Sequence, residues 1–223
     1  MISINHELGA SRRRRTLPSL QLRIDLDGIA PGIWRRLVIP ANANLGWLHA
    51  VIQLSMGWTN SHLHQFRMGD QVITDPQFGL EQFEGDPPIL DKKNVRVDEL
   101  PLTKSERLVY EYDFGDSWIH VLTFEDLPKS IHGVENMAQC IDGAWACPPE
   151  DCGSIPGYAD LLSALGNPKH PEHKSIKSWL GRPYDPEHFS AKKANVWLKK
   201  LKWPHVTEAA LRKILIARDK EYD

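Results

Sequence analysis

The spacing of apolar residues changes partway along this 223-residue chain, and that change limits the folds open to it. Before about Tyr158, apolar and polar residues alternate, which is typical of strands with one buried face. After it, apolar residues recur every three or four positions, which is typical of amphipathic helices. Strands first and helices last favour an α+β fold over a doubly wound sheet, where the two alternate. We predict an antiparallel sheet with one early buried helix and a C-terminal group of helices packed on it.

Paired segments of alternating residues predict hairpins in the first part of the chain. The strongest pair joins at Gly115-Asp116 and places Tyr112 and Trp118 in the core. Residues 75–107 are rich in Pro, Gly, Asp and Glu and are expected to be mainly a loop. The predicted strands are 20–26, 33–39, 62–68, 71–73, 94–97, 108–114 and 117–125.

One helix is predicted among these strands and at least three after them. Asn44 is a suitable N-cap, and Gly57 suits the left-handed residue that ends a helix. Apolar residues between them cover almost every side, so this helix is expected to be buried. The later apolar stripes fall within 158–165, 194–201 and 211–218.

Charge is unevenly distributed and suggests how the chain is divided. Residues 1–40 hold seven Lys/Arg and three Asp/Glu, residues 41–168 hold seven and nineteen, and residues 169–223 hold thirteen and seven. The basic ends could pair with the acidic middle within one domain, or could face an anionic partner. We predict a disordered basic arm at 1–18, one α+β domain at 19–203 and a C-terminal helix at 204–223.

The composition is that of an ordinary globular protein, with 41% hydrophobic and 25% charged residues. No segment approaches the roughly 20 apolar residues that span a bilayer. The first sixteen residues lack the apolar core of a secretory signal, and three cysteines leave one unpaired in any disulfide scheme. We therefore expect a cytoplasmic protein that does not associate with membranes.

Three cysteines lie within thirteen residues, in the segment CIDGAWACPPEDCG. Cys140, Cys147 and Cys152 could supply three thiolates to a zinc ion, which prefers four tetrahedral ligands. Their spacings differ from those of a CxxC knuckle, so they could instead be free thiols packed as small apolar side chains. The candidates for a fourth ligand are His120, His132, His170 and His173.

A second group of polar residues combines histidines with carboxylates. His62 and His64 would share one face of a strand, and the hairpin turn carries two carboxylates. Two or three histidines with a carboxylate can hold a catalytic divalent metal. Alternatively, the histidines make single hydrogen bonds and the carboxylates cap the turn. The candidate residues are His62, His64, Asp113, Asp116 and His120.

Basic residues near both ends could neutralise the phosphates of a nucleic acid. One set is the arginine run of the N-terminal arm, and the other lies on the predicted C-terminal helices. These side chains could equally form solvated surfaces without a partner. The candidates are Arg12, Arg13, Arg14, Arg15, Lys192, Lys193, Lys199 and Lys200, with Lys202 beside them.

Five segments together resemble the plasmid pRiA4b ORF-three family, some members of which are passenger proteins of insertion elements. In order they are IAPGIWRRLVIP, LHAVIQLSMGWTNSHLHQF, YEYDFGDSWIHVLTFED, CPPEDCGSIPGY and DPEHF. The resemblance extends from about Leu20 to Leu201, and YDFGDSW and CPPEDCG are its most specific parts. Ser154 departs from the family pattern, which has a second glycine there. The resemblance implies an α+β fold and no established activity.

Two hypotheses follow for the function. The first is a binding or accessory protein associated with plasmids or mobile DNA elements, with nucleic acid as its partner. The second is a metal-dependent hydrolase in which the metal activates water and a carboxylate of the His/Asp group acts as base. Metal analysis beside a salt-titrated DNA-binding assay discriminates between them.

Overall fold

The structure is a computed structural model that describes residues 18–101, 107–126, 134 and 136–222. Strands within this part of the chain are β1 (Ser19–Leu26), β2 (Trp34–Pro40), β3 (His64–Met68), β4 (Gln71–Thr74), β5 (Leu90–Asp91), β6 (Leu108–Tyr112), β7 (Trp118–Glu125) and β8 (Gln139–Ala144). They form one sheet in the order β5-β4-β3-β6-β7-β1-β2-β8. Neighbouring strands are antiparallel except β4 and β5, which are parallel. The α+β prediction is confirmed, and the sheet is mixed.

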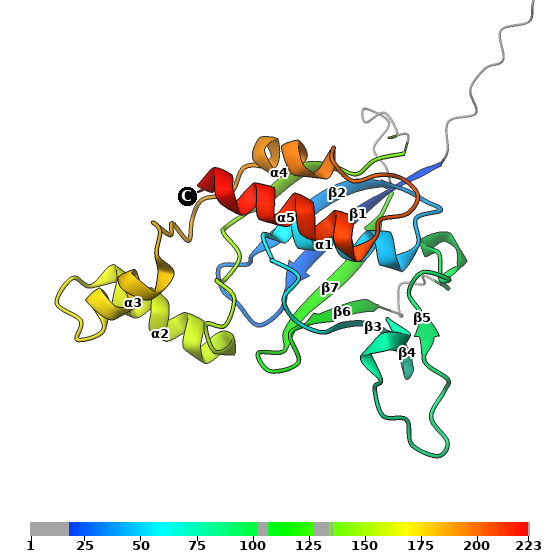
Figure 1. The fold of residues 1–223 in the computed structure, drawn as a ribbon, viewed down its shortest axis with the longest axis horizontal. Helices are drawn as coiled ribbons and strands as arrows, with labels where there is room; N and C mark the ends of the chain where they lie inside the picture. Colours follow the sequence, from blue (N-terminus) through cyan, green and yellow to red (C-terminus); the bar gives the residue numbers. More distant parts are fainter. Residues whose placement is uncertain (1–17, 102–106, 127–133, 135, 223) are drawn as a thin grey trace, which may run out of the picture.

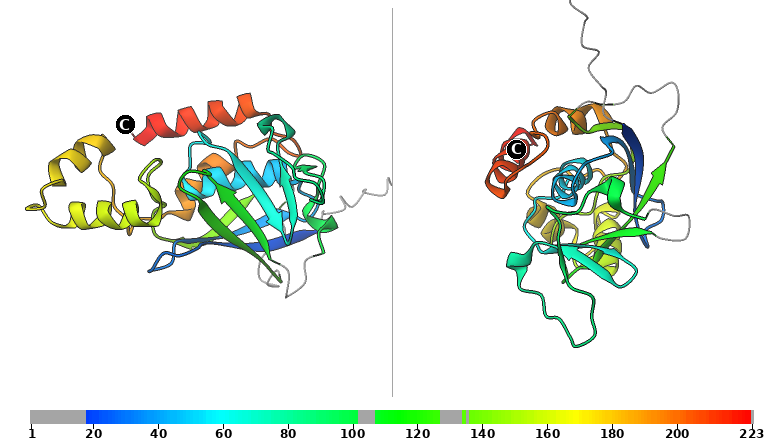
Figure 2. Two further views of the ribbon diagram at one scale, coloured as in Figure 1. Left: turned by 90° about the horizontal axis from the view of Figure 1, so that it is seen from below. Right: turned by 90° about the vertical axis from the view of Figure 1, so that its right-hand side faces the viewer.

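Helix α1 (Leu45–Met56) is the buried helix expected from the sequence. The Asn44 side chain accepts a hydrogen bond from the Trp47 N–H, and Gly57 ends the helix with a left-handed φ of 114°. Every residue of α1 except Gly46 is buried. The sheet covers one side of α1 and later helices cover the opposite side (Figure 2). A helix buried on all sides needs an apolar surface all round, which is the pattern its sequence shows.

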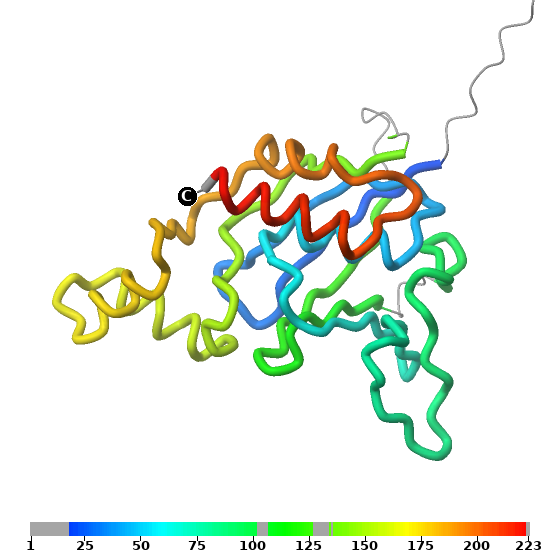
Figure 3. Tube along the Cα trace, viewed as in Figure 1, coloured from blue at the N-terminus to red at the C-terminus, as the bar shows by residue number. Residues whose placement is uncertain are grey.

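Four more helices follow the last strand: α2 (Ser154–Gly166), α3 (His173–Leu180), α4 (Ala191–Leu198) and α5 (Glu208–Tyr222). Helices α4 and α5 lie over α1, and the chain turns between them so that they run alongside each other (Figures 1 and 3). Trp197, Leu211 and Leu215 belong to the same buried core as the apolar residues of α1 and are at most 3% exposed. Helices α2 and α3 extend beyond the end of the sheet (Figure 1). Only part of the helical group therefore packs as predicted.

Two arginines satisfy the carbonyl groups at the C-terminal end of α1. Arg35 of β2 is 1% exposed and donates to the Ser55 carbonyl at 2.8 Å and to the Met56 carbonyl at 3.4 Å. Arg218 of α5 donates to the Gln53 carbonyl at 3.4 Å. Positive charge is favourable at a helix C-terminus, where the last carbonyls have no partner within the helix. These contacts join the sheet and the last helix to the same end of α1.

The β6–β7 hairpin is present as predicted, one expected strand is absent and one strand was missed. No strand covers residues 94–97; instead β5 lies at Leu90–Asp91, where it pairs with β4. The edge strand β8 was not predicted, because its QCIDGA sequence does not alternate clearly. The expected arm at 1–18 lies almost wholly outside the described residues. The proposed division at residue 203 stays a prediction.

Trp118 lies on β7 at the centre of the core and is 1% exposed. We expect Trp118→Ala to lower the free energy of unfolding by about 3–5 kcal/mol, because the substitution leaves a large cavity. Chemical denaturation followed by circular dichroism measures this loss. Trp179 of α3 is the matched control, since it is 50% exposed. Trp179→Ala should change stability by less than about 0.5 kcal/mol, and equal losses for the two variants would contradict the predicted core.

Candidate functional site

Two loops are hydrogen-bonded to each other where β3 begins and β6 ends. The first is residues 57–63, between α1 and β3, and the second is the β6–β7 turn, residues 113–117. The N–H of Asp113 donates to the Leu63 carbonyl at 2.9 Å. Asp113 has a φ of 59°, a region in which Asp is among the more tolerated residues. Its Oδ1 accepts from the Gly115 N–H at 2.9 Å, which fixes the carboxylate in the turn.

A third loop, residues 145–153, joins these two. Glu150 Oε1 accepts from the Thr59 N–H at 2.6 Å and from the Tyr112 hydroxyl at 3.1 Å. Asp116 Oδ2 accepts from the Gly153 N–H at 3.1 Å. The YDFGDSW and CPPEDCG segments, far apart in sequence, therefore meet beside the TNSH segment.

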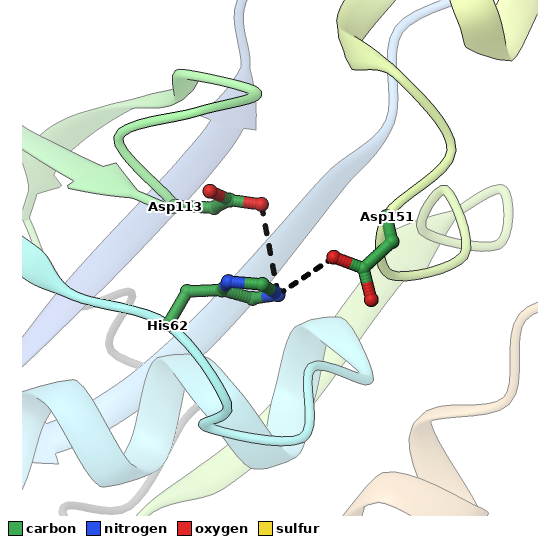
Figure 4. Close-up of side chains that lie close together, drawn as sticks. All are labelled: His62, Asp113 and Asp151. Carbon is green, nitrogen blue, oxygen red and sulfur yellow. Dashed lines mark ion pairs between the residues drawn. The ribbon is translucent and has the colours of Figure 1, made fainter.

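His62 lies where the three loops meet. Its Nε2 atom is 3.2 Å from Asp151 Oδ1, 3.5 Å from Glu150 Oε2 and 3.6 Å from Asp113 Oδ2. Figure 4 shows the ring between Asp113 and Asp151, which approach it from opposite loops. The nitrogen is shielded from solvent, yet it makes no hydrogen bond of acceptable geometry within the described part of the chain. A buried ring nitrogen without a hydrogen-bond partner is costly, so a bound cation would be favourable at this position.

The distances from His62 Nε2 to the Asp113 and Asp151 oxygens, 3.6 Å and 3.2 Å, are close to those between two ligands of one metal ion. Bonds of about 2.1 Å at tetrahedral angles place ligand atoms roughly 3.4 Å apart. One donor atom each from His62, Asp113 and Asp151 lies within 4.8 Å of the others, and no further set of this kind is found among the described residues. The Asp151 side chain is 70% exposed and that of Asp113 only 10%, so the group is accessible from one side. Such an arrangement could hold a divalent cation and leave room for water.

His64 does not join His62 at this group. Its ring stacks on His49 with 3.6 Å between centroids, and its Nε2 is 2.7 Å from Lys92 Nζ. Burial, followed by the charge on Lys92, lowers the pKa of His64 to about 3, so the ring is neutral. His62 lies in the loop before β3, and the alternation that would have aligned the two histidines does not extend to it.

His120 is a core residue and not a ligand of this group. Its Nε2 accepts from the Trp58 indole N–H at 3.1 Å, and its Nδ1 is 3.0 Å from the Trp118 carbonyl. The side chain has no exposed surface, and burial lowers its pKa to about 4. The neutral ring therefore satisfies an indole that would otherwise be buried without an acceptor.

Of the five predicted residues, the structure places His62 and Asp113 together. Asp116 instead holds the third loop through Gly153. Sequence reasoning missed Glu150 and Asp151. Their adjacent carboxylates in CPPEDCG were a usable signal, but that segment was interpreted only through its cysteines.

The three cysteines do not have the arrangement of a zinc-bound set. Cys140 lies on β8 and not in the loop, and its N–H donates to Asn195 Oδ1 at 2.7 Å. Three zinc-bound sulfurs would lie about 4 Å apart. No grouping of that kind, for atoms up to 4.8 Å apart, includes Cys140, Cys147 or Cys152 among the described residues. Burial raises the pKa of Cys140 to about 11 and that of Cys152 to about 12, so both are protonated thiols. Zinc binding by these residues stays a prediction.

The predicted nucleic-acid residues are divided between described and undescribed parts of the chain. Arg12, Arg13, Arg14 and Arg15 lie outside the described residues, as does His132. The four lysines on and after α4 are exposed, at positions 192, 193, 199 and 200. Spacings of one, seven and eight residues place them on one side of the helix. Trp197 lies on the buried side and is 3% exposed.

The fold and this group of residues define a class: an α+β protein with a helix buried between its sheet and later helices, and with a His–carboxylate cluster at one end of the sheet. The family model described as plasmid pRiA4b ORF-3-like protein matches residues 18–193. The chain belongs to that family, as the sequence motifs indicated. None of its described helices combines the length and apolar character required to cross a membrane.

Two relatives agree with this assignment. The uncharacterized protein y4hQ of Sinorhizobium fredii (strain NBRC 101917 / NGR234) is 37% identical over 155 residues, which are 69% of this chain and 76% of that protein. The crystal structure of MM3350, a protein of unknown function from Methanosarcina mazei Go1, has a TM-score of 0.67 at 34% identity. The match covers 78% of this chain and 96% of that one. The family thus supports the fold and leaves the activity open.

The neutral state of His120 has a consequence for acid stability. Its pKa is about 4 in the folded protein and about 6.5 when unfolded, so below pH 6.5 the unfolded state binds more protons. The contribution of His120 to the free energy of unfolding is therefore fully present above pH 6.5. It is lost as the pH falls toward 4. Between pH 7 and 5 it should fall by about 2 kcal/mol.

The variant His120→Gln isolates this effect, because an amide oxygen can still accept from Trp58 but does not titrate. Urea denaturation at pH 7 and pH 5 should show about 2 kcal/mol less acid destabilisation in the variant than in the wild type. Identical pH dependence in the two proteins would mean that His120 takes up a proton in the folded state.

Proposed function

We propose that this protein is a divalent-metal-dependent hydrolase whose centre is formed by His62, Asp113 and Asp151. The observation that carries the proposal is the unpartnered Nε2 of His62, which faces carboxylate oxygens of three residues at 3.2–3.6 Å. Three acidic side chains surround this one imidazole ring, so acidic groups outnumber basic ones here. A divalent cation would neutralise these acidic groups and use the nitrogen lone pair at the same time.

The chemistry expected there is activation of water. Imidazole and carboxylate ligands suit Zn²⁺ or Mn²⁺, and either ion increases the acidity of bound water. Glu150 is suited to act as general base, because hydrogen bonds from Thr59 and Tyr112 orient its carboxylate and its Oε2 faces His62. The exposed side of Asp151 leaves an approach for the substrate.

The first test is metal binding to protein treated with a chelator and then dialysed. Isothermal titration with Zn²⁺ and with Mn²⁺ should show about one equivalent bound. We expect Asp113→Asn and Asp151→Asn each to weaken binding by at least about tenfold, because each removes a charged ligand. Hydrolysis of a panel of ester and amide substrates should fall with the same variants.

The control is Asp142→Asn, which removes a carboxylate of similar exposure on β8, outside the cluster. It should leave the metal affinity unchanged. Equal binding by wild type and both ligand variants would refute this centre. Zinc lost in Cys152→Ser but retained in Asp151→Asn would assign the metal to the cysteines instead.

A second candidate function is that of an accessory protein of mobile DNA, and the lysines of α4 favour it. Lys192, Lys193, Lys199 and Lys200 lie on one exposed strip, and Lys200 Nζ is 4.2 Å from the centre of the Trp197 ring. A strip of four positive charges can follow a phosphate backbone. The family description, with its plasmid origin, agrees with this role.

Replacing all four lysines by alanine tests this role. The slope of log affinity against log salt for duplex DNA should become shallower by roughly one unit for each phosphate that a lysine no longer neutralises. The control replaces three lysines elsewhere on the surface. They are Lys169, which precedes α3, and Lys174 and Lys177, which lie on it. If wild type shows no salt-dependent affinity, or the α3 variant is weakened as much as the α4 variant, the strip is not a specific nucleic-acid surface.

A further inference from the structure

A cavity of about 420 Å³ opens beside the proposed metal centre. His62 lines it together with Asn60, Gln77, Phe78 and Glu208. The cavity and the metal centre therefore share His62. A ligand in the cavity would lie next to the carboxylates that surround that histidine.

A buried ammonium group contacts His64, Asp75 and Glu208, three residues that line this cavity. Lys92 is 1% exposed, and its Nζ contacts the neutral His64 ring at 2.7 Å. Its nearest carboxylates are Glu208 at 3.5 Å and Asp75 at 3.7 Å, and Asp75 also pairs with Lys93 at 3.3 Å. A buried charge needs compensation. Much of that compensation here comes from Glu208, at the start of α5.

A second donor is directed at the same carboxylate. Asn60 Nδ2 donates to Glu208 Oε2 at 3.0 Å. The orientation of the amide is fixed, because Asn60 Oδ1 accepts from His49 Nε2 at 2.9 Å. That histidine is oriented by Tyr110, whose hydroxyl donates to His49 Nδ1 and accepts from Gln53 Nε2. The buried network therefore directs an N–H group of Asn60 toward the cavity whether or not Glu208 is present.

Glu208 reaches this position from outside the part of the chain that the family model matches. The match ends at residue 193, whereas α5 begins at Glu208. All the other groups named around the cavity lie within the matched part. The side chain of Glu208 is also 55% exposed, so it can leave the cavity without exposing the core.

We propose that Lys92 and Asn60 form an oxyanion-binding subsite, and that Glu208 occupies it until a carboxylate or phosphate group of a ligand displaces it. This inference deepens the proposed function, on which it rests for the role of the ligand: the substrate of the metal centre would carry an anionic group. A carboxylate already fits between the ammonium and the amide. An ammonium and an amide donor recognise either kind of oxyanion.

The experiment measures anion binding in metal-free protein, so that it does not depend on the metal centre. Inorganic phosphate and acetate are titrated separately into Glu208→Gln, Glu208→Ala and wild type, and the Asn60 side-chain amide resonances are followed by NMR. We expect at least one of the two anions to bind the Glu208 variants tenfold or more tightly than it binds wild type. The anion that binds more tightly identifies the ligand group.

Two further variants make the result specific. Glu99→Ala removes a carboxylate with the same 55% exposure, from the 3-10 turn Val97–Glu99, and should leave anion affinity at the wild-type level. Asn60→Asp, made together with Glu208→Gln, restores a negative charge at the subsite and should abolish the gain. Aspartate tolerates the Asn60 φ of 57°, so the loop keeps its conformation.

The proposal is overturned if neither anion binds the Glu208 variants more tightly than it binds Glu99→Ala. Circular dichroism of Glu208→Gln should match that of the wild type, so that a failure to bind cannot be attributed to unfolding. If metal binding succeeds while anion binding fails, the metal centre stands and the subsite does not. If an oxyanion binds while no metal does, the subsite stands without the hydrolase.

Discussion

The complete burial of α1 is the constraint on which the rest of the structure depends. A helix with no exposed face must find partners for its own polar side chains and for the carbonyls at its C-terminal end. Arg35 from the sheet and Arg218 from α5 donate hydrogen bonds to these carbonyls. The Tyr110 hydroxyl of β6 forms hydrogen bonds with Gln53 and His49, two polar side chains of the helix itself. Strands, buried helix and final helix are thus joined by hydrogen bonds as well as by apolar contact.

The same hydrogen bonds place the candidate site. Gln53 Oε1 accepts from the Asn60 N–H at 2.7 Å, and His49 Nε2 contacts the Asn60 side chain. The loop that leaves α1 is therefore held at Asn60, two residues before His62. On the other side, the Ser61 N–H donates to the Tyr112 hydroxyl at 2.9 Å. A histidine held by a network of this kind loses little entropy on binding a cation, because the loop is ordered beforehand.

Charge explains how two functional candidates coexist on one small protein. The acidic middle of the sequence supplies the carboxylates around His62, and the basic C-terminal quarter supplies the lysine strip of α4. Glu208 is an exception, because it is an acidic residue from the basic part that reaches Lys92 in the acidic part. Within the described residues, the buried ammonium of Lys92 thus links the last helix to the site. No sequence pattern indicated this pair, since Lys92 lies in a segment without periodicity.

The sequence by itself determined the elements that have a repeating pattern. Alternation predicted the β6–β7 hairpin with Tyr112 and Trp118 inside, and the all-round apolar surface predicted the buried α1. These succeed because each pattern reports which faces of one element are buried. The site required the tertiary structure: three loops separated by tens of residues bring Asp151 to His62, while His64 and His120 turn into the core. Loop contacts carry no periodicity, so only the folded chain decides which polar residues meet and which satisfy the interior.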